Sequence, residues 1–131
     1  MKTSSSPLRK QLILAAILLL GFLVRFLYLD APSIWIDEVL TLNRAQMTFS
    51  ELISDILARK QVPLYFYLQH IVGNIFGINL VILRYVSVLA GTLAVGLMFR
   101  LAGLLYDWRT GLLAGGISAI SPFLVYYSRM A

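Results

Sequence analysis

Residues 33–38, which read Ser-Ile-Trp-Ile-Asp-Glu, lie just beyond the first long apolar run of the chain. A helix leaving a bilayer at this point would place the adjacent carboxylates of Asp37 and Glu38 at the membrane surface. The amphipathic ring of Trp35 belongs at the same headgroup level. The residues before this stretch are typical of membrane insertion, and the residues after it alternate between surface-lying and spanning patterns. The sequence therefore predicts an active-site loop carried on a membrane scaffold.

The composition excludes an ordinary soluble domain. Of the 131 residues, 60% are hydrophobic and 13% are charged, whereas roughly a quarter of residues are charged in soluble domains. The net charge of +5 comes from basic residues dispersed between apolar runs, which indicates membrane topology rather than nucleic-acid binding. The chain has no cysteine and one histidine, which excludes disulfides, thiol catalysis and thiolate metal sites.

Three apolar segments are predicted to cross the membrane. The first is just long enough for a tilted crossing at about 1.5 Å per residue, and no small-residue cleavage site comes after it, so we expect it to be retained. Arg25, about one turn from its outer end, is expected to snorkel to the interface as an anchor, and a role in the site is the less favoured alternative. In chain order, the expected parts are a cytoplasmic tail (1–11), a first span (12–29), an outer loop (30–79), a second span (80–106), a cytoplasmic turn (107–109), a third span (110–128) and an outer-side end (129–131).

The outer loop is predicted to contain three helices that lie on the membrane. After a break at Pro32, with Ser33 as its cap, the first helix carries Asp37 and Glu38 in its first turn, where stabilisation of the helix dipole is the alternative explanation for both acids. A second amphipathic helix covers Ser50 to Leu57. A third, over Pro63 to Gly77, would be about 22 Å long, short of a bilayer core of about 30 Å, and is expected to be a juxtamembrane or re-entrant helix on the outer side.

A membrane crossing by the third of these helices is the alternative topology. It would move Arg100 and Arg109 to the outer side, against the positive-inside rule. The arrangement with three spans keeps both on the cytoplasmic side, and leaves Arg44, Arg59 and Lys60 outside.

The last span carries small residues at close spacing, including Gly111, Ala114 and Gly115. Such a face lets helices approach closely and implies packing partners. The chain stops in mid-pattern after Arg129 and without a cap. We therefore expect a fragment of a longer protein whose remaining helices complete a cavity.

Four features together resemble a known family. They are a first span with Arg25 near its end, Trp35 followed by Asp37-Glu38, a proline-aromatic helix start at Pro63-Leu64-Tyr65, and residues 121–129, Ser-Pro-Phe-Leu-Val-Tyr-Tyr-Ser-Arg. This pattern is similar to the N-terminal third of GT-C-fold glycosyltransferases of the protein O-mannosyltransferase and aminoarabinose transferase type, glycosyltransferase family 39. The resemblance covers nearly the whole chain from Arg25 onward and implies an all-α integral membrane fold.

The resemblance implies transfer of a sugar from a polyprenyl-phosphate donor to a lipid or protein hydroxyl on the outer face of the cell membrane, with inversion. Asp37 matches the family's general base, and Glu38 matches the residue beside it. The reaction needs such a base because a hydroxyl is a weak nucleophile until a carboxylate takes its proton. The leaving lipid phosphate needs cations at headgroup depth. The candidates for that role are Arg84, Arg129, Arg59 and Lys60.

Tyr65 and Gln61 are the candidate substrate-binding residues. Many relatives read His-Pro-Pro or Lys-Pro where this chain has Gln61-Val62-Pro63, so that a neutral glutamine, with Lys60 beside it, stands where a charged group is expected. We expect no cofactor and no bound metal, because adjacent acids on one helix point about 100° apart and no further ligand is evident.

These residues also have alternative, purely structural roles. Arg84 would serve equally as a snorkelling anchor, and Tyr65 to Tyr67 as an aromatic belt at the interface. His70, without a second histidine, is expected to be a hydrogen-bonded interface residue. The alternative function is a small non-catalytic membrane protein that packs in a complex through its small-residue spans.

Overall fold

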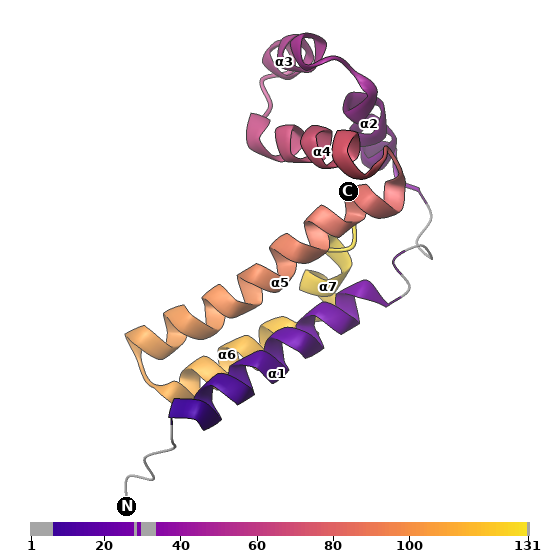
Figure 1. The fold of residues 1–131 in the computed structure, drawn as a ribbon. Helices are drawn as coiled ribbons and strands as arrows, with labels where there is room; N and C mark the ends of the chain where they lie inside the picture. Colours follow the sequence, from indigo (N-terminus) through magenta and orange to yellow (C-terminus); the bar gives the residue numbers. More distant parts are fainter. Residues whose placement is uncertain (1–6, 28, 30–33, 131) are drawn as a thin grey trace, which may run out of the picture. The chain divides into compact units, whose positions relative to one another are not determined.

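The computed structural model describes residues 7–27, 29 and 34–130. All regular secondary structure in these residues is α-helical, as predicted. The helices are α1 (Pro7–Phe26), α2 (Ile36–Gln46), α3 (Phe49–Ala58), α4 (Pro63–Phe76), α5 (Leu80–Leu105), α6 (Trp108–Ile120) and α7 (Pro122–Tyr127). Figure 1 shows their order along the chain.

The helices divide into two compact units. The first contains α1, the part of α5 that begins at Val88, α6 and α7. The second contains Leu29, α2, α3, α4 and the part of α5 that ends at Ser87, together with the segment that begins at Arg129. Among the described helices, α5 is long and apolar enough to cross a membrane, judged by length and composition.

Most helix ends coincide with local signals in the sequence. α4 begins at Pro63 and ends before Gly77, whose φ of 106° is a backbone conformation that favours glycine. α6 begins after Asp107, whose side chain accepts a hydrogen bond from the Thr110 amide. The predicted cap of α2, Ser33, lies outside the described residues, and Trp35 occupies the position before that helix.

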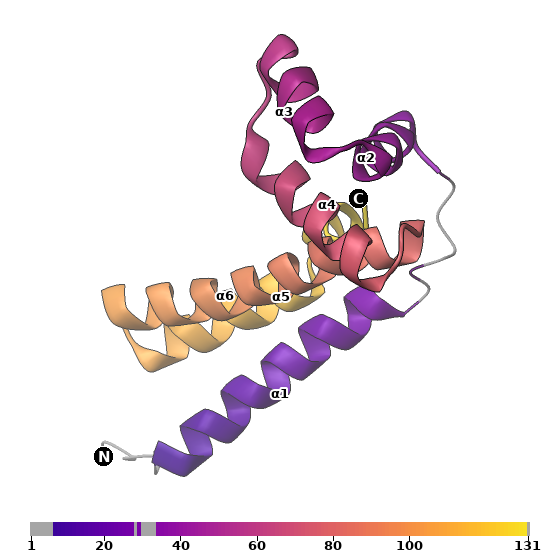
Figure 2. The ribbon, with the colours of Figure 1, turned by 45° about the horizontal axis from the view of Figure 1, so that its top comes forward.

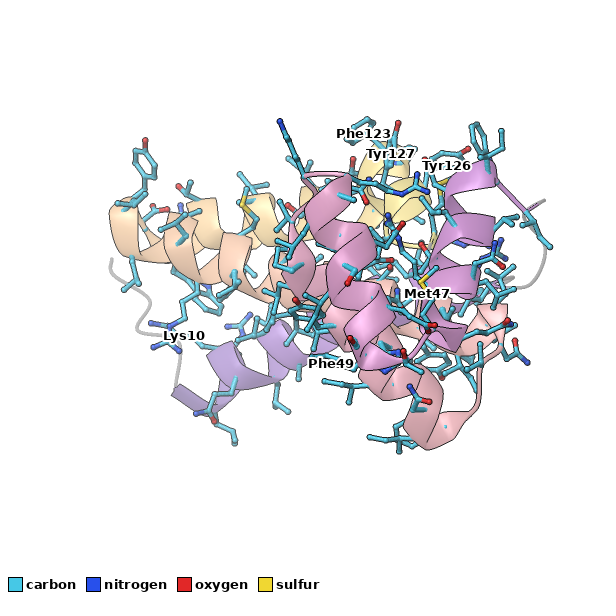
Figure 3. The ribbon with its side chains drawn as sticks, turned by 90° about the horizontal axis from the view of Figure 1, so that it is seen from above. Lys10, Met47, Phe49, Phe123, Tyr126 and Tyr127 are labelled. Carbon is cyan, nitrogen blue, oxygen red and sulfur yellow. The ribbon has the colours of Figure 1, made fainter. Side chains whose placement is uncertain are left out.

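In the first unit, α1 and α6 pack along each other in the same direction (Figure 1). At one end, the Lys10 ammonium lies 5.5 Å from the centre of the Trp108 ring, which joins the first turns of both helices. At the other end, Arg25 contacts the last turn of α6. Figure 3 labels Lys10 and the three aromatic residues of α7, in which the Tyr127 ring contacts the rings of both Phe123 and Tyr126.

α5 runs antiparallel to α6 in this unit, and glycines allow a close contact. A Cβ atom on Gly111 would lie 2.8 Å from the Phe99 carbonyl oxygen and 3.1 Å from the Cα of Gly103. A Cβ on Gly115 would lie 2.9 Å from that of Phe99. The small-residue face predicted from the sequence therefore packs against α5 of the same chain.

Arg25 is buried, with 1% of its surface exposed, and does not snorkel as predicted from the sequence. Its Nη1 donates to the carbonyl oxygens of Gly21 and Ala119 at 2.9 Å, and its Nη2 donates to that of Ser118 at 3.0 Å. The physical reason lies in Pro122, which has no N–H to donate to the Ser118 carbonyl four residues before it. Arg25 supplies the missing donors at the end of α6, where the helix dipole also favours a cation.

In the second unit, α4 contacts both α2 and α3 (Figure 2). Leu52 and Ile56 of α3 are buried, as are Ala45 of α2 and Leu83 of α5. Phe49, labelled in Figure 3, lies with its ring 5.3 Å from the Tyr67 ring and 6.0 Å from the His70 ring. These contacts join α3 to α4 through apolar and aromatic side chains.

Many large apolar side chains remain exposed in both units. On α5 they form a helical ridge, and the exposed residues of that ridge are Leu89, Leu93, Leu97, Leu101 and Leu104. Apolar surface of this extent is unusual for a soluble protein and indicates contact with lipid or with further helices.

Candidate active site at the start of α2

The first turn of α2 separates the two adjacent acids. Asp37 is exposed, and its carboxylate makes no hydrogen bond or ion pair with any residue that the structure describes. Glu38 has 1% of its surface exposed. Because successive residues of an α-helix point about 100° apart, one acid faces outward and the other inward.

Glu38 binds Arg84 of α5 through two parallel hydrogen bonds. Nε of Arg84 donates to Oε1 at 2.8 Å, and Nη2 donates to Oε2 at 2.7 Å. Both side chains are 1% exposed. Nη1 of Arg84 donates to the Leu29 carbonyl oxygen at 2.7 Å. The bidentate geometry is the strongest arrangement available to an arginine and a carboxylate.

Glu38 also closes the start of its own helix. It is the third residue of α2, and its Oε2 accepts a hydrogen bond of 3.3 Å from the Trp35 amide. This is the glutamate half of a capping box. Stabilisation of the helix start, which the sequence left open as a role for both acids, is thus present for Glu38 in addition to its ion pair.

Arg59 and Lys60, both candidate phosphate ligands, lie at the end of α3 and are exposed. The amide of Lys60 donates to the Leu57 carbonyl oxygen and that of Gln61 to the Ile56 carbonyl oxygen, both at 3.2 Å. This is the Schellman pattern of helix termination, in which the residue at the Lys60 position adopts a left-handed conformation. Lys60 has a φ of 53°, a conformation in which glycine is more usual.

Asp55 of α3 lies between two arginines. Its Oδ1 accepts a hydrogen bond of 2.9 Å from Nε of Arg59, and its Oδ2 accepts one of 2.7 Å from Nε of Arg44. These two hydrogen bonds, the one from Arg59 first, lower the pKa of Asp55 below its ordinary value. Arg44 is 1% exposed and lies over the Phe66 ring, 4.3 Å from its centre. With Lys60, the end of α3 carries more positive than negative charge.

Tyr65, a candidate substrate-binding residue, makes polar contacts within its unit. Its hydroxyl lies 3.1 Å from the Ser87 hydroxyl and accepts a hydrogen bond of 2.7 Å from Nε2 of Gln69. Nε2 of Gln69 also donates to the Leu83 carbonyl oxygen at 3.1 Å. Gln61, the other candidate, is exposed in the turn between α3 and α4.

The structure therefore brings together only some of the residues that the sequence singled out. Glu38 and Arg84 are partners, and Arg59, Lys60 and Gln61 are consecutive at one helix end. Asp37 stands apart, and Arg129 is half-buried, directly after Ser128, the cap of α7. Whether Arg84 contacts a donor phosphate stays a prediction, but the structure gives its guanidinium a different partner.

Three structurally important polar residues were not given these roles from the sequence: Arg25, Arg44 and Gln69. All are 1% exposed. A charged or amide side chain within an apolar helix is costly unless it is hydrogen-bonded, and that cost was the available signal. Within the described residues, no group of three or more histidine or acidic side chains is placed to hold a metal ion.

Comparison with known proteins identifies the family but gives no individual relative. No curated protein and no solved structure matches the chain significantly. Residues 60–131 match the family model described as dolichyl-phosphate-mannose-protein mannosyltransferase. The matched region includes Lys60, Gln61, Tyr65, Arg84 and Arg129, whereas Asp37 and Glu38 precede it. Because this match covers more than half of the sequence, the chain belongs to the dolichyl-phosphate-mannose-protein mannosyltransferase family, a group of GT-C-type membrane glycosyltransferases.

Proposed function

We propose that this glycosyltransferase moves a sugar from a polyprenyl-phosphate donor to an acceptor hydroxyl on the outer face of the cell membrane, with Asp37 as the general base. The observation that carries the assignment is the contrast in the first turn of α2. Glu38 is buried and bound to Arg84, whereas the Asp37 carboxylate is exposed and has no partner among the described residues. Of these two acids, Asp37 is the one that an acceptor can reach.

The proposed reaction is a single displacement. The acceptor oxygen attacks the anomeric carbon while Asp37 takes the hydroxyl proton. The bond between the anomeric carbon and the phosphate oxygen breaks, and its electron pair leaves with the lipid phosphate. Attack opposite the leaving group inverts the anomeric centre.

The negative charge that develops on the leaving phosphate needs donors placed in advance. Arg59 and Lys60 are exposed at the end of α3 and are offered for this role together with Arg129. Gln61 comes directly after them and is offered as a neutral donor to the phosphate or the acceptor. Tyr65 is offered as a contact for the sugar, because an aromatic ring with a hydroxyl can both pack against a sugar and hydrogen-bond to it.

We further propose that α1, α5 and the α6–α7 segment cross the membrane and that α2, α3 and α4 lie on its outer side. Packing in the first unit supports this arrangement. α1 and α6 run in the same direction there, and α5 runs in the opposite direction, as three successive crossings require. The end of this unit that holds Lys10 and Trp108 also receives Arg100 and Arg109 by sequence position, in agreement with the positive-inside rule.

The test is sugar transfer in membranes that contain the protein carrying this sequence, compared with its Asp37→Asn variant. Asparagine keeps the size of the side chain but cannot take a proton. We expect transfer to fall by about a hundredfold or more, since general-base catalysis contributes about that much. Several polyprenyl-phosphate sugars are compared as donors.

The matched control is Asn43→Ala, which truncates another exposed polar side chain of α2 and should leave transfer unchanged. Expression of each variant is measured on the same membranes. Equal transfer by wild type and Asp37→Asn would remove Asp37 from the mechanism. If the wild type transferred no sugar from any of the donors, the proposed activity itself would be contradicted.

A further inference from the structure

We infer that Glu38 and Arg84 act as one positioning unit, which fixes the first turn of α2 so that Asp37 is held toward the acceptor. This inference rests on the proposed function. It replaces two separate roles, a second catalytic acid at Glu38 and a phosphate ligand at Arg84, by a single one that neither residue fulfils alone.

The contacts of the pair connect three segments of the second unit. Through Glu38 the pair holds the Trp35 amide and the start of α2, and through Nη1 of Arg84 it holds the Leu29 carbonyl. Arg84 itself lies in the first turns of α5. The residue next to Glu38 in the first turn is Asp37. Any rotation of this turn would therefore move the Asp37 carboxylate and break both hydrogen bonds of the ion pair.

The geometry also argues against a phosphate on Arg84. The edge formed by Nε and Nη2 is the edge that binds a phosphate through two parallel hydrogen bonds. Here that edge is bound to Glu38 at 2.8 and 2.7 Å. A donor phosphate would have to displace a carboxylate that is 1% exposed, leaving that carboxylate buried without its cation.

Burial makes the two residues dependent on each other. Removing one member of a buried ion pair leaves the other charge uncompensated, whereas replacing both members by neutral groups removes the problem. A positioning pair therefore predicts a specific pattern in variants. Each single change is harmful to folding, the double neutral change is less harmful, and the folded double variant still lacks the constraint on Asp37.

The experiment compares Glu38→Gln, Arg84→Gln and the double variant carrying both changes. The first measurement is the yield of monodisperse protein after detergent extraction, which does not depend on activity. We expect each single variant to lose at least half of the wild-type yield, and the double variant to exceed both. Arg100→Gln, the same change at an exposed position of α5, is the matched control and should keep the full yield.

The second measurement is the kinetics of transfer per folded molecule, on the double variant and on the shorter-reach variants Glu38→Asp and Arg84→Lys. These last two keep both charges but lose the bidentate geometry. We expect kcat to fall by about tenfold to a hundredfold, as misplacement by about 1 Å can produce, while KM for the donor stays within about twofold. A purely structural role would reduce the yield and leave kcat per folded molecule unchanged.

Two further results would overturn the inference. One is a rise of tenfold or more in the donor KM of Arg84→Gln, at wild-type yield, when Glu38→Gln shows no such rise. This result would make Arg84 a phosphate ligand. Loss of kcat in Glu38→Gln alone, at full yield, would make Glu38 a catalytic acid.

The yield measurement separates this inference from the proposed function. If Asp37→Asn proved fully active, there would be no base for the pair to position, and the inferred effect of the pair on kcat would be wrong. A double variant that recovers yield would nevertheless establish Glu38 and Arg84 as a coupled pair.

Discussion

Asp37 and Glu38 are adjacent in the sequence, yet the helix gives them different environments. The angle of about 100° between successive residues places Glu38 against Arg84 and leaves Asp37 exposed. The pattern Trp-x-Asp-Glu therefore combines a group that is offered to substrate with a group that fixes its orientation. The same logic applies at Arg25, whose charge is used to satisfy carbonyl groups at the end of α6.

At Lys60 the backbone conformation favours glycine, whereas the proposed phosphate contact requires a positive charge. Its φ of 53° would suit glycine better, because a Cβ atom makes the left-handed region unfavourable by about 1 kcal/mol. We predict that Lys60→Gly raises the free energy of unfolding by a few tenths to about 1 kcal/mol. Thermal unfolding of the detergent-solubilised protein measures this change.

The same variant tests the proposed phosphate contact. If Lys60 contributes to donor binding, Lys60→Gly should raise donor KM by about tenfold, the size expected for one charge-assisted hydrogen bond of roughly 1.4 kcal/mol. Lys60→Arg, which keeps a positive charge at the same position, is the matched control and should leave donor KM unchanged. A stabilised variant with unchanged donor KM would remove Lys60 from the phosphate site.

At the scale of elements, the packing of α6 on α5 depends on glycines at defined positions. Gly111 faces backbone atoms of α5 at distances that leave no room for a Cβ, whereas Gly116 of the same helix has no atom within 4 Å of such a Cβ. The small-residue face on which a purely structural role in a complex was based is thus covered within the chain. This observation weakens the alternative of a non-catalytic packing protein.

The two glycines form a matched pair for mutation. We predict that Gly111→Ala lowers the free energy of unfolding by about 1 to 3 kcal/mol, because backbone atoms must move apart. Gly116→Ala should be neutral or should raise it by up to about 1 kcal/mol, since alanine favours a helix interior. Thermal unfolding of both variants in the same detergent compares them directly. Equal effects of the two substitutions would contradict the packing of α5 against α6.

At the scale of the whole molecule, the number of crossings decides which side of the membrane each segment occupies. One crossing between α3 and the turn after α5 would put these on opposite sides. A second crossing by α4 would put them on the same side. The chain has no cysteine, so single cysteines can be introduced as reporters without removing any native one.

We predict that Ser50→Cys reacts with a membrane-impermeant maleimide in intact cells, and that Tyr106→Cys reacts only after permeabilisation. Both positions are exposed, so that access to the reagent is limited by the membrane rather than by the fold. Labelling of Tyr106→Cys in intact cells, together with Ser50→Cys, would show that α4 also crosses and would overturn the arrangement with three spans.

Local signals in the sequence located most of the helix ends. Pro63, Gly77, Asp107 and Pro122 mark helix ends because they act through their own backbone or through residues within one turn. Apolar composition and the family pattern likewise identified an all-α membrane glycosyltransferase. Helix geometry likewise predicts that Asp37 and Glu38 point in different directions, but it does not say which of the two is buried.

The partners of the buried charges were decided only by tertiary structure. Arg84 binds a carboxylate 46 residues away, and Arg25 binds a carbonyl 94 residues away. From the sequence, Arg25 was expected to snorkel to the interface, and Arg84 fitted a snorkelling anchor and a phosphate ligand equally well. Burial distinguishes them: once the surrounding helices exclude water, each guanidinium must find acceptors, and the fold determines which acceptors are within reach.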